Sequence, residues 1–179
     1  QNPTSQIFCS HNLKDFLGPK YFTLIEDSTL NSYGDWNAHL FYNGGRKYLI
    51  LVNNKSFYSV FLGNIKKADF KDFRTLFFNR LAEQLLYDNV IKPTEVDITI
   101  QKYTPLIFAS TNNDRKTIGT INDFVYQYEV RRQHSYWFDK DLLEYNSSIN
   151  DSLTGAGKTK TEKYGNPVKD MRNLLNNNL

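Results

Sequence analysis

The chain has 179 residues, of which 40% are hydrophobic and 15% aromatic, so its apolar surface is sufficient for one independently folding domain. Its one cysteine excludes an intramolecular disulfide, and no apolar run approaches the roughly 18 residues of a membrane helix. The net charge of +3 lies in residues 152–179, which hold five basic and two acidic side chains, so residues 1–151 are neutral overall. A neutral body is not typical of a general nucleic-acid binder.

The N-terminal residues lack the charged stretch followed by an apolar stretch that marks a secretion signal. We therefore expect a cytoplasmic protein that has no membrane contact.

The first part of the chain is expected to form strands and one short helix. The helix His11–Leu17 would be capped by Ser10 and stopped by Gly18-Pro19. Asn43-Gly44-Gly45 is typical of a tight hairpin turn, because Asn and Gly adopt positive φ at low cost. We expect strands at Ile7–Cys9, Trp36–Tyr42, Lys47–Val52 and Ser56–Leu62, and a loop over residues 26–35.

The second part is expected to be mainly helical. Phe73, Phe77 and Leu81 follow a four-residue spacing that predicts a helix from Asp69 to about Asp88. Further elements are expected at Glu95–Gln101 and Leu106–Ser110 as strands, and at 118–134, 141–152 and 168–175 as helices.

These elements predict an α+β fold. An antiparallel β-meander sheet of about four to six strands would be packed by two main amphipathic helices, 69–88 and 118–134. Strands and helices do not alternate regularly enough for a doubly wound parallel sheet. Residues 1–151 are expected to form a single α+β domain, and residues 152–179 a basic C-terminal extension that is partly helical.

Motifs of known chemistry are incomplete in this chain. Gly155-Ala156-Gly157-Lys158-Thr159 is similar to the end of a phosphate-binding loop, but Ser152 stands where that motif needs its first glycine. The histidines His11, His39 and His134 have no metal-binding spacing, and one cysteine cannot build a usual zinc site. We therefore expect no metal ion and no cofactor.

Two single residues have an ordinary interpretation beside a functional one. His39 lies on a predicted strand, where it is either a half-exposed strand residue or a catalytic group. Cys9 follows Ile7 and Phe8, and we expect it to be a small buried hydrophobe rather than a nucleophile.

The stretch Thr111–Asp123 is rich in polar side chains and joins an apolar run to an amphipathic helix. Polar segments between two structured elements frequently carry function. In one interpretation this segment caps the helix, and Thr120 and Asp123 have capping-box spacing. In the other, Arg115 beside the free N–H groups of a helix N-terminus forms an anion site. The residues alone leave both interpretations open.

The sequence resembles, over nearly its whole length, an uncharacterised family of small prokaryotic and mobile-element proteins carried only as a domain of unknown function. The segments that carry the resemblance are Cys9–Lys14, the Trp-x-Ala-x-Leu-Phe strand at Trp36–Phe41, Arg46–Asn53, Lys66–Phe70 and the Thr-x-Asn-Asp-Arg-x-x-Ile-Gly-x-Ile-Asn-Asp signature at Thr111–Asp123. The chain departs from the pattern at His39, where the family often has Asn, and at Thr120-Ile121, where Ser-Met is usual. The resemblance implies no activity.

We expect a non-enzymatic interaction or regulatory module, in which Arg46, Arg115 and Asn122 contact an anionic or polar partner. The alternative is a nucleic-acid-binding or nuclease-like toxin or defence protein, with His39, Arg115 and Asp123 as its candidate chemistry. Whether the protein is an enzyme stays open, as do its oligomeric state and whether its partner is a protein or a nucleic acid. The candidate binding residues are Trp36, His39, Arg46, Asn53, Asn113, Asp114, Arg115, Gly119, Asn122 and Asp123.

Overall fold

The computed structural model describes residues 4–23, 30–134, 142–155 and 164–176, and every structural statement below concerns these residues. Most of the glycine-rich segment 155–159 lies outside them. The elements follow in the order β1 (Ser5–Cys9), α1 (His11–Leu17), β2 (Trp36–Asn43), β3 (Arg46–Asn53), β4 (Ser59–Leu62), α2 (Phe73–Tyr87), α3 (Val96–Gln101), β5 (Leu106–Ser110), α4 (Arg115–His134), α5 (Leu142–Asn150) and α6 (Pro167–Asn176).

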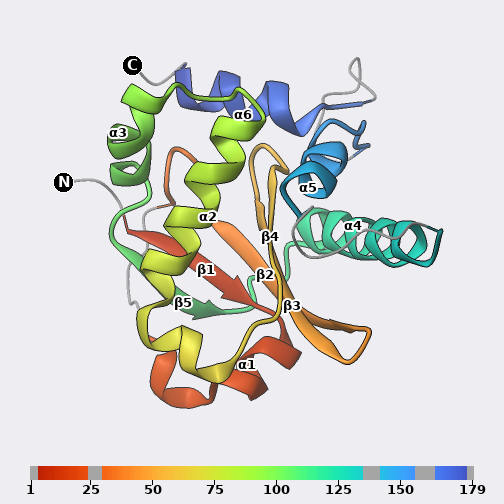
Figure 1. The fold of residues 1–179 in the computed structure, drawn as a ribbon. Coiled ribbons are helices and arrows are strands. Elements are labelled where there is room, and N and C mark those ends of the chain that lie inside the picture. Colours follow the sequence, from red (N-terminus) through yellow and green to blue (C-terminus); the bar gives the residue numbers. More distant parts are fainter. Residues whose placement is uncertain (1–3, 24–29, 135–141, 156–163, 177–179) are drawn as a thin grey trace.

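The five strands form one mixed sheet in the order β4-β3-β2-β1-β5, as Figure 1 shows. β2, β3 and β4 are the antiparallel meander that the sequence predicts. β1, however, is parallel to both of its neighbours, because Ile7 pairs with Trp36 of β2 and with Phe108 of β5. The prediction of a wholly antiparallel sheet is therefore wrong, and the carboxyl ends of β1 and β5 lie side by side.

One wrongly predicted element explains why the parallel direction of β5 was missed. Residues Val96–Gln101 form helix α3 and not a strand. Thr99 is buried and Val96 and Ile100 pack against the core, whereas Ile98 is 50% exposed, which is the spacing of a helix. Because α2 and α3 lie between β4 and β5, the chain enters β5 through a helical crossover rather than a hairpin, as a parallel strand requires.

Helices cover both faces of the sheet (Figure 1). α1, α2, α3 and α6 contribute to a core on one face, around the buried Trp36, Leu51 and Phe77. α4 and α5 contribute to a core on the other face, around Ile50 and Phe61. The prediction that the helices after residues 69 and 118 cover the sheet is confirmed, and they lie on opposite faces. Each helix in the described part of the chain is too short or too polar to cross a membrane.

The tight turn between β2 and β3 is confirmed, because Gly44 and Gly45 have φ of 57° and 74°, as a two-residue hairpin turn of this hand requires. Three boundaries differ from the predictions. β4 begins only at Ser59, and a 3-10 helix (Lys67–Asp72) precedes α2. α4 begins at Arg115, several residues before the predicted start.

The outer edge of β4 is closed by side chains of α5. Asn150 accepts hydrogen bonds from the Ser59 backbone N–H at 2.8 Å and donates to the Ser59 carbonyl at 3.0 Å. One turn earlier, Asn146 accepts from the Phe61 N–H at 3.0 Å. Two amides four residues apart on a helix thus replace a sixth strand, and they block pairing at this edge.

Candidate functional site

A crevice forms where β1 and β5 end. These two strands are parallel neighbours, but the helices that follow them lie on opposite faces of the sheet, since α1 joins the core with α2 while α4 joins the other core. The chain therefore leaves the two strand ends in opposite directions. In open α/β sheets this arrangement creates the crevice in which ligands usually bind, outside the carboxyl ends of the strands.

The crevice holds a cavity of about 340 Å³ between the β1–α1 turn, β2, the β5–α4 loop and α4. This volume lies at the small end of the range for small-molecule sites. The lining residues are Phe8, Ser10, His11, Asn12, Asn37, Ala38, His39, Thr111, Asn113, Ile118, Ile121 and Asn122.

An amide pair joins the two sides of the crevice. Asn37 of β2 is buried, and its side-chain N–H donates to Asn112 Oδ1 at 2.9 Å. The Asn112 amide donates back to Asn37 Oδ1 at 3.4 Å. Because β1 lies between β2 and β5 in the sheet, this pair reaches across the end of β1 and holds the β5–α4 loop at a fixed distance from β2.

The β5–α4 loop is the first part of the polar stretch Thr111–Asp123, whose other residues form the first turns of α4, and most of the hydrogen bonds of the loop are internal. Asn112 Oδ1 accepts from the Asp114 N–H at 3.1 Å, and Asn113 has a φ of 55°. Asp114 then caps α4, because its carboxylate accepts from the N–H groups of Lys116 and Thr117 at 3.1 and 3.2 Å. The loop therefore caps the helix, as the first interpretation predicts from its Asn and Asp residues, and Asp114 is the cap, whereas the Thr120–Asp123 pair lies inside α4.

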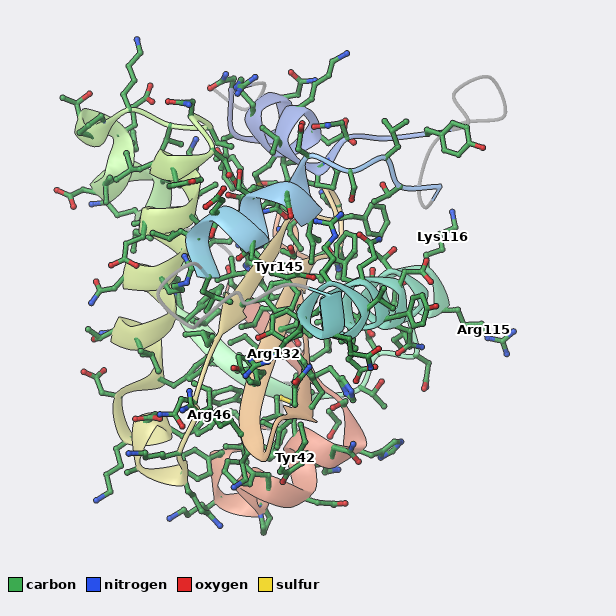
Figure 2. All side chains as sticks on the ribbon, turned by 45° about the vertical axis from the view of Figure 1, so that its right-hand side comes forward. Tyr42, Arg46, Arg115, Lys116, Arg132 and Tyr145 are labelled. Carbon is green, nitrogen blue, oxygen red and sulfur yellow. The ribbon has the colours of Figure 1, made fainter. Side chains whose placement is uncertain are left out.

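This capping also bears on the anion-site interpretation. A carboxylate already occupies the N-terminus of α4, where it satisfies the free N–H groups and the positive end of the helix dipole. Arg115 is exposed, and Figure 2 shows it extending away from the body of the protein beside Lys116. Arg115 and the helix N-terminus thus do not form a common anion site.

His39 lines the crevice from β2 and is held by Ser10. The Ser10 hydroxyl lies 3.0 Å from His39 Nδ1, and Ser10 Oγ also accepts from the Leu13 N–H as the cap of α1. Because a hydroxyl oxygen has two acceptor sites and one proton, the tautomer of the neutral ring sets the direction of the Ser10–His39 hydrogen bond. Burial lowers the pKa of His39 below its ordinary value of 6.5, which favours this neutral form.

The candidate residues predicted from the sequence fall into separate places. His39, Asn113 and Asn122 meet in the crevice. Arg115, Gly119 and Asp123 line a different hollow of about 340 Å³, between α4 and residues Leu153–Gly155. Figure 2 shows Arg46 on the β2–β3 hairpin, well separated from Arg115.

Two further candidates are buried parts of the fold. Trp36 is fully buried and packs edge-to-face on Phe77, with ring centroids 5.2 Å apart. Asn53 is also fully buried, and its Oδ1 accepts from the N–H groups of Lys55 and Ser56 in the turn that leads to β4, while its amide donates to the Tyr33 carbonyl. Neither side chain lines the crevice.

A family model described as a domain of unknown function (DUF6933) matches residues 6–170. The chain belongs to this family. The match begins in β1 and ends in α6, so the family domain includes every residue of the crevice. The predicted membership of an uncharacterised family is confirmed, while the individual motifs remain predictions. No significant match was found among curated proteins or among solved structures.

Within this family domain, sequence reasoning missed several residues of the crevice, among them Ser10, Asn37 and the exposed Ile118. Ser10 and Thr111 each follow directly after a strand, and that is the signal that identifies them once the two strands are known to be parallel. Among the described residues, no three His, Cys, Asp or Glu side chains converge on a point where they could hold a metal ion.

Proposed function

We propose that the protein is a binding module that holds a small, uncharged molecule in the crevice at the carboxyl ends of β1 and β5. The observation that carries this proposal is the composition of the lining, which combines neutral polar side chains with the apolar Phe8, Ile118 and Ile121. Apolar walls with a few placed hydrogen-bonding groups are typical of sites for small molecules.

The way in which the crevice is held also supports binding. The Asn37–Asn112 pair and the Ser10–His39 contact fix several of the polar groups before any ligand arrives. A preorganised site loses less conformational entropy on binding, so more of the interaction energy appears as affinity. Asn122 is exposed and lines the crevice, so its side-chain amide is accessible to a ligand.

The nuclease-like alternative gains no support from this geometry. His39 lines the crevice, while Arg115 and Asp123 line the hollow on the other side of α4, so the three do not act on one substrate atom. A role in prokaryotic or mobile-element systems follows only from the family resemblance, and it stays a prediction, as does the cytoplasmic location expected from the sequence.

Filling the crevice tests the proposal. Asn122 and Asp123 are both exposed neighbours on α4, but they line different hollows. Asn122→Phe would therefore place a ring in the crevice, and Asp123→Phe would place the same ring on the opposite side of the helix. A library of neutral and charged small molecules would be screened by ligand-observed NMR against the wild type and both variants.

We expect neutral molecules that bind the wild type and Asp123→Phe but not Asn122→Phe. If the wild type binds nothing in the library, or if both variants bind equally, the crevice is not the ligand site. Both variants would be checked for native folding by circular dichroism, because exposed helix positions usually tolerate substitution within about 0.5 kcal/mol.

A further inference from the structure

We propose that the crevice binds a nucleobase, as the free base or as a nucleoside. This inference rests on the proposed function, and it names the chemical class of the ligand. It draws on three properties of the lining: the absence of Asp, Glu, Lys and Arg, the number of side-chain amides, and the apolar surface beside them.

The lining holds no permanently charged side chain, and its two titratable residues are His11 and His39. None of the twelve residues around the cavity is an aspartate, glutamate, lysine or arginine. A charged group that enters such a site loses hydration without gaining a counter-charge, which is costly. The part of the ligand inside the crevice is therefore uncharged, and a phosphate group attached to it would remain outside.

Half of the hydrogen-bonding side chains of the crevice are amides, from Asn12, Asn37, Asn113 and Asn122. A side-chain amide carries a donor and an acceptor side by side in one plane. This pattern matches the edge of a nucleobase, where a ring nitrogen lies next to an amino or carbonyl group, and Asn is a usual bidentate partner of adenine. Among the described residues, Asn113 and Asn122 have side-chain amides without partners, so both remain available.

The apolar residues supply surfaces for the flat faces of a ring. Ile118 and Ile121 lie one turn apart on α4, and Phe8 reaches the cavity from β1. Ile118 is 36% exposed, so a bound ring would cover apolar surface that now faces water. Proteins that hold an unpaired base use the same combination, with apolar side chains against the faces and hydrogen bonds to the edge.

His39 adds a further hydrogen-bonding group to this set. Since Ser10 is bonded to Nδ1, Nε2 is the ring nitrogen that remains for a base, as a donor or as an acceptor according to the tautomer.

Calorimetric titration of the full chain with adenosine, guanosine, cytidine and uridine tests the inference, with ribose and glucose as neutral comparisons. In parallel, the side-chain amide signals of the asparagines would be followed by two-dimensional NMR. We expect at least one nucleoside to bind and to shift the Asn122 amide signal. The corresponding nucleoside monophosphate should bind with similar affinity, because its phosphate lies outside the lining.

Asn122→Leu keeps most of the side-chain volume but removes both hydrogen-bonding groups, and it should weaken nucleoside binding roughly tenfold or more. Asp123→Leu, which lines the other hollow, is the matched control and should leave the affinity unchanged. If the two variants bind a nucleoside equally, the amide does not read the base, and the inference is wrong.

The remaining outcomes separate this inference from the proposed function. If a sugar or another neutral molecule binds in the crevice and no nucleoside does, the ligand class is wrong, but the binding function stands. If an oligonucleotide binds and nucleosides do not, the base pocket is equally refuted. If no compound shifts any crevice signal, both the ligand class and the proposed function fail.

Discussion

The amide pair across the crevice gives the most direct test of how the site is built. Asn37→Ala and Asn112→Ala each remove the pair, whose two hydrogen bonds measure 2.9 and 3.4 Å. A net hydrogen bond contributes about 0.5–1.5 kcal/mol, and the longer of these two is weak, so the pair should contribute about 1 kcal/mol. Asn112→Ala should lower the free energy of unfolding by more than the pair alone contributes, because Asn112 also accepts a hydrogen bond from the Asp114 N–H.

Urea unfolding of the wild type, the two single variants and the double variant forms a double-mutant cycle. We expect the double variant to lose about 1 kcal/mol less than the sum of the single variants, since the shared interaction can be lost only once. Asn122→Ala, combined with Asn37→Ala, is the control pair and should be additive, because the Asn122 amide has no partner among the described residues. Additivity of the Asn37 and Asn112 effects to within about 0.3 kcal/mol would refute the interpretation of this pair as a clamp.

Three further predictions concern the edge of the sheet, the histidine and the cysteine. Asn150→Ala removes the oxygen that accepts hydrogen bonds from the backbone N–H and the hydroxyl of Ser59, so the buried Ser59 N–H is left unpaired. Urea unfolding should show that the free energy of unfolding falls by about 3–5 kcal/mol. A decrease below about 1 kcal/mol would contradict the edge-capping role. Because burial lowers the pKa of His39 below 6.5, the unfolded chain takes up a proton there first as the pH falls, so the free energy of unfolding decreases below about pH 6.5. His39→Gln should reduce that decrease between about pH 7.5 and pH 5, and an unchanged pH dependence would show that His39 is not its source. Burial raises the pKa of the Cys9 thiol to about 12, so iodoacetamide should alkylate Cys9 in urea but not in the native protein, whereas equal rates would mean that the thiol is accessible.

The hairpin and the first helix were predictable because local chemistry decides them. Gly44 and Gly45 supply the positive φ that the turn between β2 and β3 needs, and Ser10 and Gly18 mark the two ends of α1. Such signals depend on a few neighbouring residues, so they can be read without knowledge of the rest of the chain.

Residues Val96–Gln101 show where local signals fail. Their apolar residues alternate as in a strand, yet Val96, Thr99 and Ile100 also have the spacing of one helical face, and a segment this short fits both patterns. Packing against the core stabilises the helix rather than the strand, and the chain crosses from β4 to β5 through α2 and α3.

In the candidate site, too, some features are set by neighbouring residues and others by the packing of the whole chain. The stretch Thr111–Asp123 was recognisable as a polar helix entry from its sequence, and its capping role is borne out through Asp114. The sequence did not show which of its residues face a common cavity, because Asn122 and Asp123 are neighbours in sequence but lie on different sides of α4. A helix turns about 100° per residue, so its orientation against the sheet decides which of the two enters the crevice.

The sequence by itself thus determined the meander, the helices α1, α2 and α4, the absence of a disulfide, and the neutral character of residues 1–151. Only the tertiary structure decided that β1 runs parallel to β5, and that the helices after them leave on opposite faces. The physical reason is distance along the chain: nearly 100 residues separate the two strands, and their pairing depends on the packing of every element between them. The crevice with Ser10, His39 and Asn122 exists only as a consequence of that pairing.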